Sequence, residues 1–271
     1  MAPEKKFRFP KEIPLEEYPK PEEFLNETKR LTDAAQKEGL ILRVMGPIAL
    51  YFYFPEYIDL YQHMDRLGER VFGDIDYAAY GKHRGKLVKF FLSQGYDFEK
   101  DTMMYFGKDR HIYYSDRIPM IDVFYEKLDM NHCVEFRGRL EIHPYCVSLT
   151  ELLLQKLEIV KINDKDLKDM MLLLVAAPLG NDDLKTINKE YLAKRMSDDW
   201  GFYYTSKGNL EHLKKACMKV PALSETHQST ICQKADEIIQ CIEDVPKTFG
   251  WKLRARTGPK KIWYTEVSDW S

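Results

Sequence analysis

The sequence predicts an α+β protein, in which a mixed β-sheet core with helices on one side is followed by a C-terminal helical region. Up to residue 147, short apolar runs bounded by Gly or Pro alternate with helix-like segments. Beyond residue 147, apolar residues recur with helical spacing to about residue 244. A strand–helix–strand order followed by a meander is typical of a mixed sheet covered on one face.

The composition is that of an ordinary globular protein with a sizeable core. The chain has 271 residues, of which 44% are hydrophobic and 31% charged, enough for one large domain or two modest ones. The formal net charge of -2 excludes a bulk electrostatic attraction to nucleic acid or acidic membranes, although it allows a local basic patch. The five cysteines are odd in number and form no C-x-x-C pair, which predicts reduced thiols and no structural zinc.

We expect a cytoplasmic protein with no membrane segment. The first residues lack the apolar segment of a signal peptide. Nowhere does an apolar run approach the roughly 20 residues that span a bilayer.

Composition shifts divide the chain into four expected parts. Residues 1–21 carry five prolines, which favours an extended arm. The other parts are a core over 22–147, a helical region over 148–250 and a basic, aromatic tail over 251–271. Within the core we expect helices over Glu22–Lys37, Ile48–Phe54 and Lys82–Gln94, strands over Leu40–Met45, Asp74–Tyr80 and Pro119–Tyr125, a hairpin over Met103–Ser115, and a short strand pair near Val134–His143.

Two aspartates on the second expected strand form the first candidate site. In Gly73-Asp74-Ile75-Asp76, successive side chains alternate between faces, so Asp74 and Asp76 project the same way. Adjacent carboxylates repel each other unless a cation lies between them, and Mg2+ prefers such oxygen ligands. The alternative is a solvated strand edge or turn that happens to carry two acids.

A third aspartate, Asp122, lies in the apolar segment Pro119–Tyr125, on the same face as Met120 and Phe124. A lone carboxylate in such surroundings is costly unless it is paired or bound to metal. The alternatives are that it caps a neighbouring backbone or pairs with Arg117.

Lys156 is the fourth signal, because it falls in the middle of an apolar helical stripe. Ser148-Leu149-Thr150-Glu151 is a capping box that marks the start of this helix. A lysine at such a position needs an anionic side chain or ligand, unless it reaches past the helix edge to water. On the next helix, Asp166 borders the apolar stripe. It is a partner of Lys156, a substrate contact, or a helix N-terminal acid after Asn163 that the helix dipole favours. For Asp169 the last interpretation is favoured.

Gly46-Pro47 forms a turn between a strand and a helix. A helix N-terminus offers free N–H groups to phosphate, and Gly46 allows close approach to the backbone. Pro47 removes one of these donors.

The order of these segments resembles the nucleotidyltransferase superfamily of DNA polymerase beta type, over roughly residues 40–175. There a Gly-Gly or Gly-Ser turn precedes a D-x-D pair, and a third acid follows on another strand; the matching residues are Met45-Gly46, Asp74-Ile75-Asp76 and Ile121-Asp122-Val123. The segments Ser148–Leu157 and Lys165–Asp169 are similar to the abortive-infection and related toxin-type nucleotidyltransferases. Pro47 and the long gap from Gly46 to Asp74 depart from the superfamily pattern.

The resemblance implies a catalytic site and a reaction. Asp74, Asp76 and Asp122 would hold Mg2+ or Mn2+, Gly46 would lie near the triphosphate, and Lys156, with Asp166, would complete the nucleotide site. A nucleoside monophosphate would pass from a triphosphate such as ATP to an acceptor hydroxyl on an RNA end, a protein or a small molecule, with release of pyrophosphate.

The rival hypothesis is a nucleotide-binding or interaction protein that keeps the fold without turnover, and Pro47 favours it. Two aromatic segments are candidate RNA contacts. For 198–204, packing of the helical region against the core is the favoured interpretation, and for the tail it is a solvated segment. The tail residues concerned are Arg254, Arg256, Lys260, Lys261, Trp263 and Tyr264.

Overall fold

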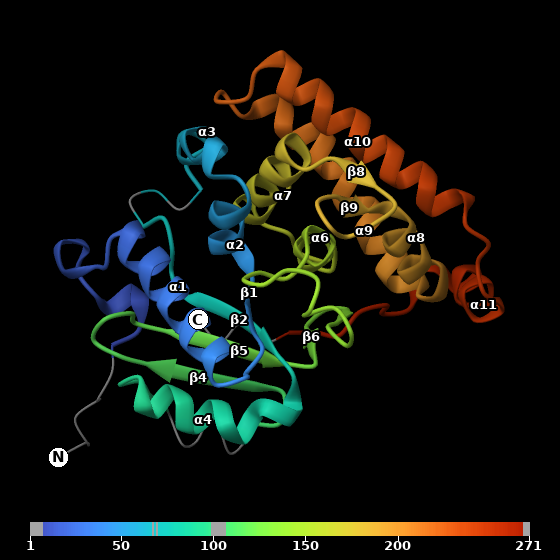
Figure 1. Ribbon diagram of the computed structural model, residues 1–271. Coiled ribbons are helices and arrows are strands. Elements are labelled where there is room, and N and C mark those ends of the chain that lie inside the picture. Colours follow the sequence, from blue (N-terminus) through green and yellow to red (C-terminus); the bar gives the residue numbers. More distant parts are fainter. Residues whose placement is uncertain (1–7, 67, 69, 99–106, 268–271) are drawn as a thin grey trace. The chain divides into compact units, whose positions relative to one another are not determined.

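The structure, a computed structural model, describes residues 8–66, 68, 70–98 and 107–267. The chain divides into two compact units (Figure 1). Unit 1 comprises Met1–Tyr53, Leu67–Leu128 and Glu135–Val147. Unit 2 comprises Phe54–Arg66, Asp129–Val134 and Ser148–Ser271. The division is therefore not a single cut at residue 148, because two short segments of the expected core belong to unit 2.

Unit 1 is built on a five-stranded mixed sheet. Its strand order is β1-β2-β5-β4-β3, with β2 and β5 parallel and the other neighbours antiparallel. The strands are β1 (Leu42–Val44), β2 (Ile75–Ala79), β3 (Asp97–Phe98), β4 (Arg110–Tyr114) and β5 (Ile121–Tyr125). The mixed sheet predicted from the sequence is thus confirmed.

Helices α1 (Pro21–Lys37) and α4 (Arg84–Ser93) pack on one face of this sheet. The hydroxyl of Tyr77 on β2 donates to the Thr28 carbonyl of α1 at 3.2 Å. Phe91 of α4 stacks on Tyr113 of β4 with ring centroids 4.2 Å apart. The strand register places Tyr77 and Tyr113 on the same face, so both helices cover that face. The opposite face carries Asp76, Asp122 and Arg110.

Local signals explain where the elements of unit 1 begin and end. Pro21 opens α1, and Gly39, with a φ of +69°, ends its C-terminal turn. Helix α2 (Gly46–Tyr53) follows β1 directly, as expected. Strand β4 is the second arm of the hairpin expected over Met103–Ser115, while 103–106 lie outside the described residues. On the side away from β5, strand β4 pairs with β3.

The strand pair expected near Val134–His143 is wrong over most of its length. Strand β7 (Cys133–Glu135) pairs with β6 (Lys127–Asp129), and residues 136–143 form turns. The reason is local: Gly138 adopts a φ of +68°, and the Arg139 N–H donates to the Phe136 carbonyl at 2.9 Å. These turn bonds use backbone groups that a second strand would need.

The Pro-rich arm lies against unit 1 rather than running free. It contains two short 3-10 turns, Pro10–Glu12 and Leu15–Glu17. The Tyr18 hydroxyl donates to the carbonyls of Phe72 and Gly73, both at 3.0 Å. Arg70 donates to the Ile13 carbonyl at 2.7 Å.

Unit 2 is helical, and each of its helices from α6 onward begins at a polar capping residue. The caps Ser148, Asn163, Asn188, Asp199, Ser224 and Thr248 accept backbone N–H groups of the following turn. The helices are α3 (Ile58–His63), α6 (Leu149–Leu157), α7 (Asp164–Ala176), α8 (Lys189–Asp198), α9 (Trp200–Ala216), α10 (Glu225–Asp244) and α11 (Phe249–Thr257); strands β8 (Leu179–Gly180) and β9 (Ile187–Asn188) form a small parallel pair. Ser148 caps α6 as expected, since its Oγ accepts from the N–H groups of Thr150 and Glu151, and its hydroxyl donates to the Glu151 carboxylate.

The expected solvated tail is instead packed on unit 2 as far as it is described. The Trp263 indole N–H donates to Thr205 Oγ1 at 3.0 Å, and the Thr265 N–H donates to the Asn131 carbonyl at 3.0 Å. The absence of a side chain at Gly201 permits this contact, since a Cβ there would lie 2.3 Å from the Trp263 carbonyl oxygen. Phe202 likewise stacks on His132 of the same unit, so the aromatics of 198–204 pack within unit 2.

Within the described ranges, no helix combines the length and the apolar character needed to cross a lipid bilayer.

The buried His111 predicts a pH dependence of stability. Its Nε2 bonds the Gly107 carbonyl at 2.9 Å, and Tyr125 donates to its Nδ1 at 3.0 Å. Burial lowers the pKa of His111 to about 4, whereas an unfolded histidine titrates near 6.5. Between these values only the unfolded chain takes up the proton, so the free energy of unfolding falls as pH falls from about 6.5 to 4, by up to about 3 kcal/mol.

Urea denaturation followed by circular dichroism at several pH values tests this. His111→Gln should flatten the slope in that window, while His212→Gln, which alters an exposed ring, should keep the wild-type slope. An unchanged slope for His111→Gln would contradict the assignment.

Candidate functional site

Asp76 and Asp122 lie next to each other on the face of the sheet that α1 and α4 leave uncovered. They are direct partners in the parallel register of β2 and β5, so their side chains project to the same side. Asp122 is only 2% exposed, whereas Asp76 is partly exposed. Asp74 immediately precedes β2 and is partly exposed as well. The sheet therefore brings two of the predicted acids together and places the third two residues away.

Arg110 on β4 supplies positive charge to this group of carboxylates. Its Nε donates to Asp122 Oδ1 at 2.7 Å, and its Nη2 donates to Asp122 Oδ2. Burial alone would lower the pKa of Arg110, but the bond to Asp122 and the charges of Asp122, Asp76 and Asp74 raise it on balance. All three predicted acids thus act on one guanidinium. The partner of Asp122 is Arg110 rather than Arg117, the alternative taken from the sequence.

The carboxyl of Asp122 experiences two opposing effects. Burial raises its pKa, and the two bonds from Arg110 oppose that rise. A bidentate bond uses one lone pair on each oxygen, which leaves the other lone pairs able to accept a further donor or cation.

The arm contributes to the same site through Tyr18. Its hydroxyl is fixed on the carbonyls of Phe72 and Gly73, directly before Asp74. Burial, and secondarily the charge of Asp74, raise the pKa of Tyr18 to about 12, so the phenol stays protonated and keeps donating. The arm therefore orders the segment that carries the first aspartate.

Gly46, the first residue of α2, lies against the side chain of Asp76. The Met45 N–H donates to the Asp76 carbonyl at 2.8 Å, which brings the start of α2 to the D-x-D segment. Gly46 adopts a φ of +62°, and a Cβ at this position would lie 3.2 Å from Asp76 Oδ2. Both features require glycine here, and the proximity that the sequence predicts between the turn and the acids is present.

No metal cluster is seen within the described parts of the chain, meaning no group of three or more His, Cys, Asp or Glu side chains placed to hold an ion. The three-aspartate metal site therefore stays a prediction. What the structure adds is the arginine that balances these acids.

Lys156 and Asp166 belong to unit 2, where they form a separate ionic network. The Lys156 ammonium lies 2.7 Å from Asp166 Oδ1 and 2.8 Å from Asp169 Oδ2. Arg66 and the Tyr61 hydroxyl also bond Asp169. The anionic partner expected for Lys156 is thus present on the next helix, and it consists of two aspartates.

Asp169 is more than the helix N-terminal acid expected from the sequence, because it is fully buried and has three polar partners. Burial by itself would raise the pKa of Asp169, but the charges of Lys156 and Arg66 lower it on balance. Burial would lower the pKa of Lys156, and Asp169 and Asp166 raise it. The ammonium is therefore held charged and neutralised by protein groups.

Sequence reasoning missed both arginines of these sites. An apolar strand with one aspartate signals that a cation is needed nearby, but only the register of β4 on β5 identifies it as Arg110. Arg66 lies outside any helix or strand, at the end of the segment that follows α3, and has no comparable local signal.

Comparison with known proteins adds one structural likeness. No protein-family model matches the chain, and no curated protein matches it. Among solved structures, the antibiotic-resistance factor ANT(2'')-Ia is similar with a TM-score of 0.35 and 15% sequence identity, covering 65% of this chain and 94% of that chain. A likeness of this size assigns neither a family nor an activity.

The conformation of Gly46 yields a stability prediction. Gly46→Ala should lower the free energy of unfolding by about 1–2 kcal/mol, because an L-residue is strained at positive φ. Thermal or urea denaturation measures this change. Gly73→Ala, where a Cβ meets nothing within 4 Å and φ is not in the left-handed region, is the matched control and should cost less.

The Lys156 network predicts unequal costs for its members. Asp169→Asn should lower the free energy of unfolding by about 3–5 kcal/mol, because it leaves two buried cations without their shared anion. Lys156→Met should cost less, since Asp169 keeps Arg66. Urea denaturation followed by the fluorescence of Trp200, Trp251 and Trp263, all in unit 2, measures both.

A phosphate-binding role for Lys156 predicts a different pattern. Lys156→Met would then keep wild-type stability and lose affinity for nucleotide. That pattern would contradict the structural role assigned by these contacts.

Proposed function

We propose that the chain is a nucleotidyltransferase, which transfers a nucleoside monophosphate from a nucleoside triphosphate to an acceptor hydroxyl. The observation that carries the proposal is the parallel register of Asp76 and Asp122, with Gly46 against Asp76 and Asp74 two residues away. Paired carboxylates beside the start of a helix provide cation ligands next to backbone donors for phosphate. The resemblance noted in the sequence joins the same residues.

The donor set fits Mg2+ or Mn2+ in its chemistry, because all three groups are carboxylates, and two of them, Asp76 and Asp122, lie side by side on one face of the sheet. Arg110, bonded to Asp122, already places one positive charge beside these carboxylates. Asp74, Asp76 and Asp122 would hold the ion, whose contribution is to stabilise charge at the reacting phosphate.

The protein's own groups have separate roles in this proposal. Asp122, oriented by Arg110, accepts the proton of the acceptor hydroxyl. Gly46 allows the triphosphate to approach the backbone at the start of α2. Arg110 remains beside the phosphate and offsets negative charge as it develops. For Lys156 the contacts with Asp166 and Asp169 support a structural role in unit 2 in place of the expected phosphate contact.

A second candidate is nucleotide binding without turnover. The bidentate bond of Arg110 to Asp122 favours it, because this bond keeps the carboxylate engaged. Pro47, in the first turn of α2, favours it as well, since it removes a phosphate donor.

Release of pyrophosphate separates the two candidates. The full chain is incubated with each labelled nucleoside triphosphate, Mg2+ or Mn2+, and total RNA, protein or small hydroxyl acceptors. Asp76→Asn should lower pyrophosphate release by about 100-fold or more. Asp116→Asn, which alters an exposed aspartate of the same unit, should retain wild-type release.

Binding is measured separately by titration calorimetry with ATP and Mn2+. Metal-dependent nucleotide binding that requires Asp76, with no pyrophosphate from any acceptor, would establish the binding protein instead. If the chain neither binds nucleotide nor releases pyrophosphate, both candidates are overturned.

A further inference from the structure

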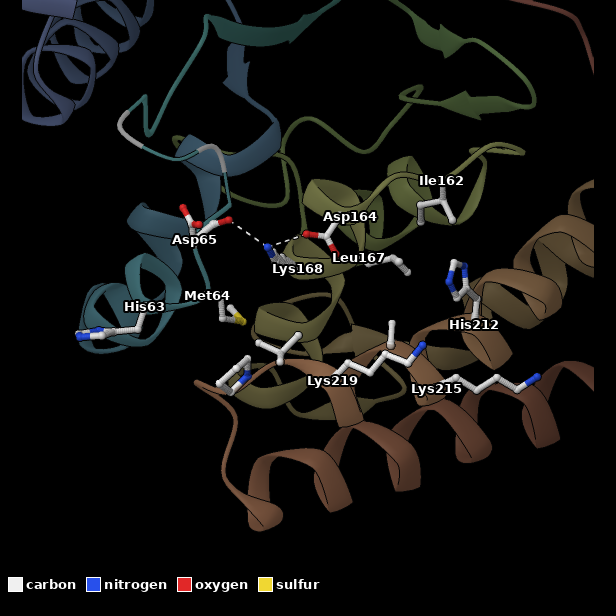
Figure 2. A pocket seen from close by; sticks show the side chains of 13 residues that line it. His63, Met64, Asp65, Ile162, Asp164, Leu167, Lys168, His212, Lys215 and Lys219 are labelled. Carbon is white, nitrogen blue, oxygen red and sulfur yellow. Dashed lines mark hydrogen bonds and ion pairs between the residues drawn. The ribbon is translucent and has the colours of Figure 1, made fainter.

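A long hollow follows helix α9 along one side of unit 2. One part of it, of about 830 Å³, is lined by the C-terminal end of α9, the start of α7 and the end of α3 (Figure 2). A second part, of about 310 Å³, continues toward the N-terminal end of α9. Ile162 and His212 line both parts, so the two hollows are neighbours along α9, and together they are called the groove below.

One end of this groove is basic. Lys215 and Lys219 are exposed on the wall formed by α9 and its 3-10 extension, and a third lysine, Lys161, lines the other part of the groove. None of these three lysines forms an ion pair with another residue in the described part of the chain. Figure 2 shows Lys168 on the facing wall, where it bonds Asp164 at 2.6 Å and the Asp65 carbonyl at 2.9 Å.

The acids of the groove are fewer than its cations. Asp164 is neutralised by Lys168, and Asp65 lies at the end formed by α3. His63 and His212 also line this part, and Figure 2 shows the His63 ring turned away from the other lining residues. The groove therefore carries excess positive charge in a protein whose net charge is -2.

The other end of the groove is aromatic. Tyr204, 40% exposed, lines it together with Trp263. The Tyr204 ring is supported from behind by Trp200, stacked at 5.0 Å, and meets Trp263 edge to face at 5.1 Å. Trp263 is fixed by its bond to Thr205. A supported and exposed ring of this kind offers a surface on which a planar base stacks.

Between the two ends, Gly208 keeps the groove open. It lies in the middle of α9, where glycine costs about 1 kcal/mol relative to alanine. A Cβ at Gly208 would meet nothing within 4 Å, so packing does not explain the glycine. Tyr204, Gly208, His212, Lys215 and Lys219 recur every three or four residues and line one side of α9 and its extension. The helical part, from Tyr204 to Lys215, is about 17 Å long at 1.5 Å per residue.

We propose that this groove binds a single-stranded nucleic acid, with bases stacked at Tyr204 and Trp263 and the phosphate backbone running past Gly208 to Lys215 and Lys219. The combination of a cationic channel and a stacking surface is what single-stranded nucleic acid requires, and a purely anionic ligand would not use the aromatic end. Binding of the strand is independent of the proposed function. A role of the bound strand as the acceptor rests on the proposed function.

Fluorescence anisotropy of a labelled oligouridine of about 12 nucleotides, titrated with the full chain in the absence of triphosphate, tests the proposal. Tyr204→Ala should weaken binding by about 5- to 150-fold through the loss of stacking. Lys215→Gln should weaken binding and reduce the slope of log affinity against log salt by about 0.7. Lys29→Gln and Lys37→Gln, on exposed lysines of α1, should leave affinity unchanged, and their salt slopes should match the wild type.

Gly208→Leu is a second test, because this substitution should fill the groove while the protein still folds. Leucine favours the helix more than glycine does, so thermal stability should be unchanged or higher while the groove is filled and RNA affinity falls at least 10-fold. Wild-type RNA affinity in this variant would overturn the proposal. A duplex RNA that binds as tightly as the oligouridine would overturn it too. So would full displacement of the oligouridine by inorganic polyphosphate, if Tyr204→Ala also binds the oligouridine with wild-type affinity.

The same assay distinguishes this proposal from the nucleotidyltransferase assignment. Asp76→Asn should bind the oligouridine as tightly as the wild type. If the oligouridine binds in the groove but no acceptor gives pyrophosphate, the transfer reaction is refuted and the groove proposal stands. If pyrophosphate release depends on Asp76 but no RNA binds, the groove proposal is refuted and the transfer reaction stands.

Discussion

The parallel pairing of β2 and β5 is the constraint on which unit 1 depends. It sets Asp76 beside Asp122 on a face where one carboxylate is buried, and two such charges cannot lie together without a cation. Arg110 provides that cation from the next strand of the sheet, two positions along from the residue paired with Asp122. The order β2-β5-β4 is thereby tied to an ionic contact as well as to apolar packing on the other face.

Unit 2 solves the same electrostatic problem in the opposite sense. There a lysine lies inside an apolar stripe, and two aspartates of α7 enclose its ammonium. Arg66 and Tyr61 then complete the bonding of the deeper aspartate, so every charge of the network has a partner. Such networks stabilise little over apolar packing, but removing one member leaves a buried charge unpaired. In this unit the network joins α6, α7 and the segment after α3 through ionic contacts.

Much of the fold follows from the sequence because its signals are local. Polar caps, Pro21 and the glycines after α1 and α4 set helix ends, and alternation of side chains placed Asp74 and Asp76 on one side. What could not be predicted depends on register and on contacts between distant segments. Ile112 lies opposite Asp122, which makes Arg110 its diagonal neighbour, and no property of either strand alone fixes that offset. The packing of Trp263 on Gly201 joins residues 62 positions apart. The sequence predicts that Asp166 lies deeper than Asp169, whereas Asp169 is the more deeply buried of the two.

The charge distribution gives the two units different chemistry. The contrast is local and does not extend to the units as wholes: three acids act on one arginine in unit 1, while lysines without ion pairs among the described residues line part of α9 in unit 2. Carboxylates at a sheet face suit a metal–triphosphate, and a cationic groove with exposed rings suits a polynucleotide. A metal–triphosphate and a polynucleotide are both anionic overall, so each proposed site needs its own positive charge. In unit 1 that charge would come from Arg110 together with the metal ion, and in unit 2 it would come from Lys215 and Lys219. The two proposals therefore rest on separate groups of residues, one in each unit.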